Sequence, residues 1–194
     1  VEDLRIERLG PSGQSEPQEA FIRAIREAMP DDGILVPGMT QIGYYSRIHC
    51  PVYEPRTYLT SSYFGNLGFA FPVALGAKVG RPDKAVVAIS GDGGFLFNSQ
   101  ELATAVQYGI NVVVIVFNDN AYGNVLRDQI VKFDGRTIGA KLHNPDFVKL
   151  AEAYGARGVR AVSAEQLESV MREALSLSVP TLIEVPVGMM PAPY

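Results

Sequence analysis

The 194-residue chain contains no tryptophan, only two histidines and a single cysteine, Cys50. One cysteine excludes an internal disulfide and any iron–sulfur or zinc site built from several thiolates. No apolar run approaches the roughly 20 residues that a membrane-spanning helix needs, and the net charge of −4 comes without a basic cluster. We therefore expect no nucleic-acid partner and no membrane association. Because no secretory signal sequence is recognisable, the expected location is cytoplasmic.

Short apolar runs alternate along the chain with segments of helical character. We predict buried strands over 33–38, 57–63, 84–90, 111–117, 156–162 and 180–187. Helices are predicted over 18–29, 68–80, 99–108, 145–155 and 163–177. This alternation predicts an α/β fold with a doubly wound, mostly parallel sheet and helices on both faces.

Local signals set the expected boundaries of these elements. Ser15 with Gln18, and Ser163 with Gln166, have the spacing of a helix-capping box, and Asn144 stands before Pro145 as a further cap. Residues 120–143 lack clean periodicity, so we predict a long functional loop or a poorly ordered segment there. We interpret residues 1–16 as a linker and 17–194 as one domain cut from a longer protein.

Two aspartates end two neighbouring apolar runs. Asp92 lies in the Gly-rich sequence Ser90–Gly94, and Asp119 lies in Asn118–Asn120. Parallel strands would deliver both carboxylates to the same edge of the sheet, where open α/β sheets bind ligands. Two hard oxygen ligands beside a glycine turn suit Mg²⁺ holding a diphosphate group. The alternative is that both aspartates only form turns.

The Gly-Asp-Gly turn, an intervening helix, a second strand and then Asn-Asp-Asn-Ala-Tyr-Gly resemble the metal–diphosphate motif of thiamine-diphosphate-dependent enzymes. The resemblance is to the acetolactate synthase and benzoylformate decarboxylase group, and it covers only the C-terminal, diphosphate-binding domain. It implies the thiamine-diphosphate-binding fold, with thiamine diphosphate and Mg²⁺ as cofactors. It further implies a decarboxylase or carboligase acting on 2-oxo acids.

The resemblance assigns roles residue by residue. It implies Asp92, Asp119 and the Ala121 carbonyl as metal ligands, although the family more often has asparagine at position 119. Leu67 would prop the bent cofactor and the Gly65 carbonyl would accept from its amino group; the alternative for Leu67 is a core leucine. The full set of implied cofactor-binding residues is Gly38, Met39, Thr40, Gln41, Gly65, Leu67, Ser90, Gly91, Asp92, Gly93, Gly94, Asp119, Ala121, Tyr122 and Gly123.

No catalytic residue can be assigned in this chain. In the resembled family, an activating glutamate comes from a pyrimidine-binding domain across a subunit interface. We therefore expect the chain to be inactive alone, with that domain, in the parent chain or a partner subunit, as its partner in a homodimer or homotetramer. The segment after Gly123 lacks the tryptophan common in acetolactate synthases, which favours a relative with another 2-oxo acid.

Two other interpretations remain at this point. The chain could be the small subunit of a two-chain decarboxylase of the sulfopyruvate or phosphonopyruvate type. It could also be a non-catalytic nucleotide- or flavin-binding module, although no G-x-G-x-x-G sequence follows the first predicted strand.

Overall fold

The computed structural model describes residues 16–61 and 63–192 of the chain. Within them, one sheet has the strand order β1-β2-β3-β5-β4, and every neighbouring pair is parallel. The strands are β1 (Ile34–Pro37), β2 (Val86–Gly91), β3 (Val113–Asn118), β4 (Arg157–Arg160) and β5 (Thr181–Pro186). The predicted α/β fold is confirmed, and the sheet is wholly parallel.

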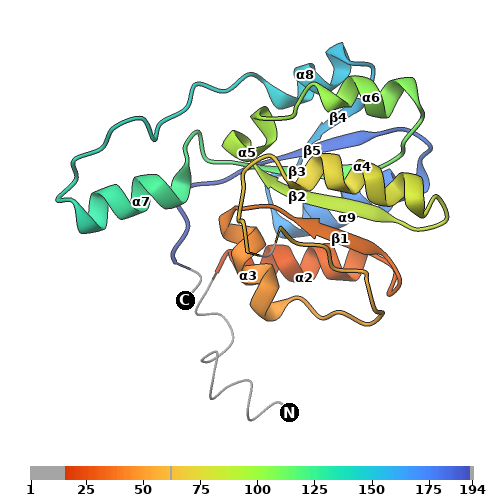
Figure 1. The fold of residues 1–194 in the computed structure, drawn as a ribbon, viewed down its shortest axis with the longest axis horizontal. Helices are drawn as coiled ribbons and strands as arrows, with labels where there is room; N and C mark the ends of the chain where they lie inside the picture. Colours follow the sequence, from red (N-terminus) through yellow and green to blue (C-terminus); the bar gives the residue numbers. More distant parts are fainter. Residues whose placement is uncertain (1–15, 62, 193–194) are drawn as a thin grey trace, which may run out of the picture.

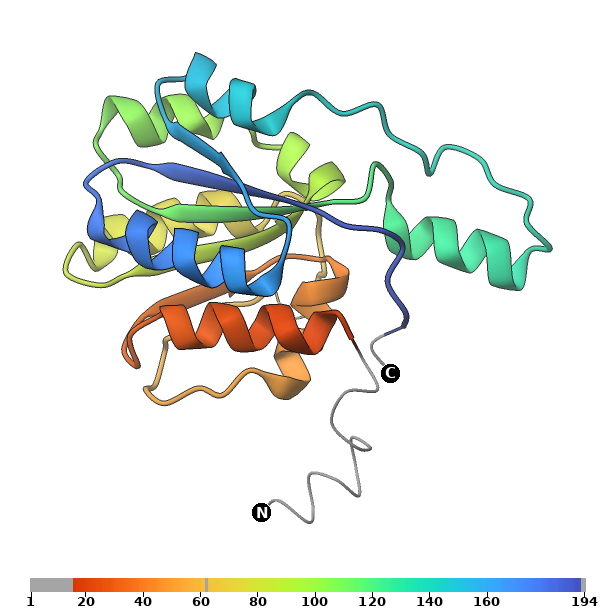
Figure 2. The ribbon, with the colours of Figure 1, turned by 180° about the vertical axis from the view of Figure 1, so that it is seen from behind.

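Helices cover both faces of the sheet (Figures 1 and 2). One layer consists of α2 (Gln18–Ala28), α3 (Gln41–His49) and α9 (Ala164–Ser176). The other consists of α4 (Ala70–Gly80), α5 (Asp92–Leu96), α6 (Glu101–Gln107) and α8 (Phe147–Ala153). The remaining helix, α7 (Gly123–Lys132), belongs to neither layer and projects beyond the sheet.

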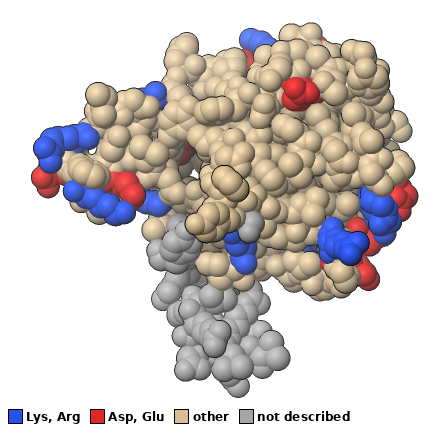
Figure 3. Space-filling view, in the orientation of Figure 1, with Lys and Arg blue, Asp and Glu red and all other residues tan. Residues whose placement is uncertain are grey.

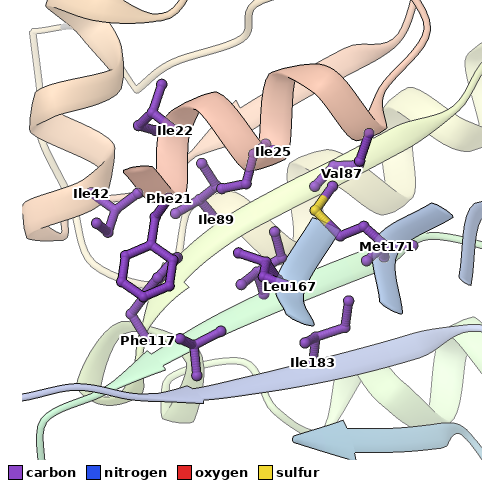
Figure 4. Packing of buried hydrophobic residues seen from close by; sticks show 14 of the residues in the cluster. Phe21, Ile22, Ile25, Ile42, Val87, Ile89, Phe117, Leu167, Met171 and Ile183 are labelled. Carbon is purple, nitrogen blue, oxygen red and sulfur yellow. The ribbon is translucent and has the colours of Figure 1, made fainter. Parts of the chain in front are cut away.

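Each face of the sheet has its own hydrophobic core because parallel strands covered on both sides bury side chains in both directions. Figure 4 shows the core under α2, α3 and α9, where Phe21 meets Phe117 edge to face with ring centroids 5.3 Å apart. The opposite core centres on Phe95, which contacts both Phe71 and Phe147. These two cores hold the loops at the carboxyl ends of the strands in place.

The strand predicted over 57–63 is wrong. The segment makes a single bridge, in which Leu35 donates to the Thr57 carbonyl (2.8 Å) and Leu59 donates to the Leu35 carbonyl (2.9 Å). The chain then leaves the edge of β1 and carries Gly65 and Leu67 to the wall of a cavity, so the ladder cannot continue.

The predicted loop over 120–143 is wrong for residues 123–132, which form α7. No residue of α7 is buried, so this helix needs no apolar stripe and its sequence has no clear 3.6-residue period. In Figure 3, the lobe that contains α7 stands out from the body and carries both basic and acidic side chains.

The caps predicted for the starts of two helices can be compared with the structure only in part. Ser163 caps α9 by accepting from Gln166 N (3.2 Å), as predicted. The Gln166 side chain accepts from Val162 N (3.1 Å), one residue before the cap, so the second bond of the predicted capping box is not formed. The Ser15 cap, and nearly all of the predicted linker over 1–16, lie outside the described residues.

Candidate active site at the carboxyl edge of the sheet

A cavity of about 250 Å³ opens at the carboxyl edge of the sheet. Segments that follow β1, β2, β3 and β5 form its wall, together with the segment around Gly65 and the start of α7. Of the residues predicted from sequence, the wall contains Met39, Thr40, Gln41, Gly65, Leu67, Gly91, Asp92, Gly93, Gly94, Asp119, Ala121, Tyr122 and Gly123. The topology thus brings together segments that are far apart in the chain.

Two predicted residues do not line the cavity. Gly38 N–H donates to the Ile89 carbonyl (2.7 Å) and continues the pairing of β1 with β2. Ser90 is buried, and its hydroxyl donates to the Gly91 carbonyl (3.0 Å). Both residues lie directly behind the wall, at the ends of the strands that support it.

Asp92 and Asp119 lie on the same wall, directly after β2 and β3. Asp92 is only 2% exposed, and its Oδ1 accepts from Gly93 N (2.8 Å). Asp119 Oδ1 accepts from Ala121 N (3.1 Å). Burial raises the pKa of the Asp92 carboxyl above its usual range. Burial, and secondly the charge of Asp92, raise the pKa of Asp119 to about 6.

Glycine allows the loops after β2 and β3 to approach each other closely. A Cβ on Gly93 would lie 2.5 Å from Tyr122 Cε1 and 2.7 Å from Cδ1 of the same ring. A Cβ on Gly123 would collide with Asp119 Oδ2. A larger residue at Gly93 would push the two carboxylate-bearing loops apart, whereas one at Gly123 would displace the Asp119 carboxylate within its own loop.

Leu67 lies on the cavity wall and is 36% exposed, which excludes a role as a core leucine. Its Cδ2 would be 3.8 Å from a Cβ placed on Gly94, so this side chain lies beside the glycine turn. The predicted propping role of Leu67 remains a prediction.

Asn144 does not cap α8, in contrast to the prediction. Asp146 is the cap, and its carboxylate accepts from Val148 N (3.1 Å) and Lys149 N (3.2 Å). Asn144 Nδ2 donates instead to Asp92 Oδ2 (2.6 Å). Sequence reasoning missed this contact because two residues able to cap a helix stand two positions apart, and Asn144 was assigned the local role.

Pairing between distant segments delivers Asn144 to the site. Tyr122 N donates to the Ala140 carbonyl and Leu142 N donates to the Asn120 carbonyl, both at 2.8 Å. The segment that returns from α7 therefore runs beside the segment that leaves β3. This pairing places Asn144 against Asp92, 52 positions earlier in the chain.

Several other wall residues were not predicted. They are Tyr44, Phe117, Asn124, Val125, Val187, Gly188 and Met190. Asn124, at the start of α7, accepts from Gln41 Nε2 and from Arg127 Nη2 (2.5 Å). The only feature of the sequence that could have indicated a role for Asn124 is its position directly after the Asn118–Gly123 motif.

The two histidines and the cysteine do not line this cavity. His49 stacks on Tyr45 with ring centroids 3.9 Å apart, and His143 is exposed. Cys50 is a free thiol whose pKa is raised by burial. Among the described residues, no group of three or more His, Cys, Asp or Glu side chains is arranged to hold a metal. Any metal here would therefore rely on two carboxylates and on oxygens of other kinds.

The family model for the thiamine pyrophosphate enzyme C-terminal TPP-binding domain matches residues 38–185. The chain belongs to this family. The match favours the thiamine-diphosphate interpretation over a nucleotide- or flavin-binding module, and the implied acetolactate-synthase-like C-terminal domain is confirmed.

Individual relatives agree with this assignment. The acetolactate synthase large subunit of Haemophilus influenzae is 37% identical over 167 residues, which are 86% of this chain and 29% of that protein. A probable 2-ketoarginine decarboxylase of Pseudomonas aeruginosa is 34% identical over 168 residues, 86% of this chain and 30% of that protein. The chain therefore spans less than a third of the length of these relatives.

A solved structure shows the same fold. The thiamine diphosphate-dependent 4-hydroxybenzoylformate decarboxylase of Rhodococcus jostii RHA1 matches with a TM-score of 0.82 and 32% sequence identity. The match covers 92% of this chain and 34% of that chain. Within residues 16–61 and 63–192, no helix combines the length and apolar character that crossing a bilayer requires.

Proposed function

We propose that this chain binds Mg²⁺ and the diphosphate of thiamine diphosphate at the carboxyl edge of its sheet. The observation that carries the proposal is the placement of Asp92 and Asp119 on one cavity wall, beside the Gly91–Gly94 turn. The ligands would be the two carboxylates and the Ala121 carbonyl. Oxygen ligands of this kind are those that Mg²⁺ prefers.

The charges of the cavity support a cation. Two carboxylates line it, and no lysine or arginine is among the described residues of its wall. Burial raises the pKa of both carboxyls, and the charge of Asp92 adds to the rise at Asp119, so the ionised forms are unfavourable there without a counter-ion. A divalent cation would supply that counter-charge and would bridge the wall to an anionic diphosphate.

The Ala121 carbonyl is also suited to the role of a ligand. The hydrogen bonds that pair its segment with residues 140–142 use Tyr122 N and the Asn120 carbonyl instead. On the other side of the cavity, Gly94 lies in the first turn of α5, where backbone N–H groups have no partner within the helix. Gly94, Thr40 and Gln41 would face the diphosphate.

When bound, thiamine diphosphate supplies an electron sink for breaking or making carbon–carbon bonds next to a carbonyl group. This chain would hold the diphosphate end through the metal, and Leu67 would support the cofactor from the wall. We propose that the complete protein acts on a 2-oxo acid as a decarboxylase or carboligase. The glutamate that activates the cofactor would come from a pyrimidine-binding domain, so the chain alone would be inactive.

Calorimetric titration tests the proposed site in the complete protein. Thiamine diphosphate and FAD are each added with and without Mg²⁺, and we expect Mg²⁺-dependent binding of thiamine diphosphate. Asp92→Asn keeps the shape of the side chain but removes its charge, and it should weaken this binding at least tenfold. Asp83→Asn is the matched control, because Asp83 is exposed and pairs with Arg81 at the surface. Equal binding by both variants would refute the metal site.

A further inference from the structure

A continuous series of hydrogen bonds crosses the sheet from Asp92 to Arg160. Asn144 Nδ2 donates to Asp92 Oδ2 (2.6 Å) and to Asn118 Oδ1 (2.8 Å). Asn118 Nδ2 donates to Glu184 Oε1 (2.8 Å). Arg160 donates to Glu184 Oε2 from Nε (2.9 Å) and from Nη2 (2.7 Å). These bonds connect β2, β3, β5 and β4 in their order in the sheet.

The two ends of this series determine how each amide is turned. Arg160 can only donate and the Glu184 carboxylate can only accept, so Asn118 must present its NH₂ group to Glu184. Asn118 Oδ1 is then left to accept from Asn144, and it also accepts from Asn120 N (3.2 Å). Asn144 must therefore turn its NH₂ group toward Asn118, and the same group reaches Asp92.

Burial makes this polarity strict. Glu184 is 4% exposed, Asn118 is 9% exposed and Asp92 is 2% exposed. A reversed amide would bring two oxygens together without water to separate them, which is costly in a buried site. The Arg160 side chain is 46% exposed, so it compensates the buried Glu184 charge from the surface.

We propose that Arg160, Glu184, Asn118 and Asn144 form a positioning network that fixes the orientation of the Asp92 carboxylate for metal binding. None of the four lines the cavity, so Arg160, Glu184 and Asn144 would act through Asp92. Asn118 would act through Asp92 and also through Asn120 N, which donates to Asn118 Oδ1 (3.2 Å) in the loop between Asp119 and Ala121. The inference rests on the proposed metal–diphosphate site and assigns it a second layer of residues. Hydrogen-bonded partners of metal-ligating carboxylates commonly tune metal affinity in this way.

Glu184→Gln is the sharpest single test, because it keeps the shape of the side chain and reverses the required polarity. The new glutamine must turn its oxygen to Arg160, so its NH₂ group faces Asn118 and forces that amide to reverse. Asn144 then reverses as well and turns its oxygen toward Asp92. We expect a 10- to 100-fold weaker affinity for Mg²⁺ and for Mg²⁺–thiamine diphosphate, by analogy with other residues behind metal ligands.

Glu173→Gln provides the matched control. Glu173 lies on α9 and its Oε2 pairs with Arg157 Nη2 at 2.8 Å, so the same carboxylate–arginine pair loses the same charge. This glutamate is mostly exposed and lies outside the series that reaches Asp92. We expect the affinities of this variant to equal those of the unmodified protein.

The double variant Asn118→Asp/Glu184→Gln restores the polarity with the original net charge. The aspartate introduced at position 118 accepts from the glutamine at position 184 on one side and from Asn144 on the other, which returns the Asn144 NH₂ group to Asp92. We expect the double variant to bind Mg²⁺–thiamine diphosphate more tightly than either single variant. It also guards against a single variant that fails to fold, because each of the hydrogen bonds between positions 184, 118, 144 and 92 is formed again.

Calorimetry with Mg²⁺ alone and with Mg²⁺ plus thiamine diphosphate, and thermal unfolding without metal, are measured on the complete protein. If Glu184→Gln lowers only the unfolding temperature, or if the double variant restores stability but not affinity, the network is merely structural and the inference is overturned. If the unmodified protein binds neither ligand, the proposed function itself fails. Ligand binding by the unmodified protein therefore distinguishes a failure of the proposed network from a failure of the proposed metal–diphosphate site.

Discussion

The ring of Tyr122 lies directly against the backbone of Gly93, so the loops that follow β3 and β2 touch at this point. An ideal Cβ on Gly93 would fall 2.5 Å from Tyr122 Cε1. The contact joins the turn that carries Asp92 to the segment that carries Asp119 and Ala121. The spacing of the proposed metal ligands thus depends on the absence of one side chain.

Gly93→Ala should separate these loops. We expect it to reduce the free energy of unfolding by about 1–3 kcal/mol, as overpacking of a close contact typically does, and to weaken Mg²⁺-dependent cofactor binding. Gly76→Ala is the control, since nothing lies within 4 Å of its added methyl in α4. That control should stabilise the protein by about 0.5–1 kcal/mol, because alanine favours helix. Urea unfolding and calorimetry measure both effects, and unchanged affinity in Gly93→Ala would contradict the prediction.

Metal-free stability should depend on the ionisation of Asp119. Its pKa rises from 3.8 to about 6 in the folded state, so the folded state holds this proton more tightly than the unfolded state. The stabilisation is present below about pH 4 and is lost as the pH rises through about 6. Asp119→Asn removes this pH dependence.

The check is the unfolding temperature of both proteins between about pH 4 and pH 7. We expect the advantage of Asp119→Asn over the unmodified protein to grow with pH in the absence of metal. Saturating Mg²⁺ should abolish that advantage at neutral pH. A difference between the two proteins that does not vary with pH would show that Asp119 does not titrate in this range.

Helix α7 should become protected when the metal–diphosphate site is filled. None of its residues is buried, so its amides should exchange with solvent far faster than those of β3. The helix begins two residues after Ala121, the proposed backbone ligand, so ligation would anchor its start. We expect at least tenfold slower exchange across 123–132 when thiamine diphosphate and Mg²⁺ are added together.

Helix α2 serves as the internal reference for that exchange experiment, because it packs against α9 and belongs to a hydrophobic core. Its exchange should change little on adding the cofactor. Equal protection of α7 with and without cofactor, in a protein shown to bind it, would make α7 a static element.

The isolated chain should not decarboxylate pyruvate or benzoylformate. The activating glutamate is assigned to another domain, and the chain spans 29% of the acetolactate synthase that it resembles. Carbon dioxide release is measured with Mg²⁺ and thiamine diphosphate added, beside the complete protein as a positive control. Turnover above background by the isolated chain would show that activation does not need that glutamate.

The sequence by itself determined the five strands of the sheet, the helices α2, α4, α6, α8 and α9, and the two aspartates that follow β2 and β3. Those features follow from local patterns: buried parallel strands are continuously apolar, and a short motif carries each carboxylate. Even the family could be inferred, because its motif is contiguous within residues 90–123.

Only the tertiary structure decided which residues surround those carboxylates. Asn144 has a plausible local role as a helix cap, but pairing between residues 120–122 and 140–142 turns it toward Asp92 instead. Helix α7 escaped prediction because it buries no face, and a helix outside the core leaves no apolar period in the sequence. The bonds from Asp92 to Arg160 cross four strands, and such bonds depend on strand order, which no local pattern encodes.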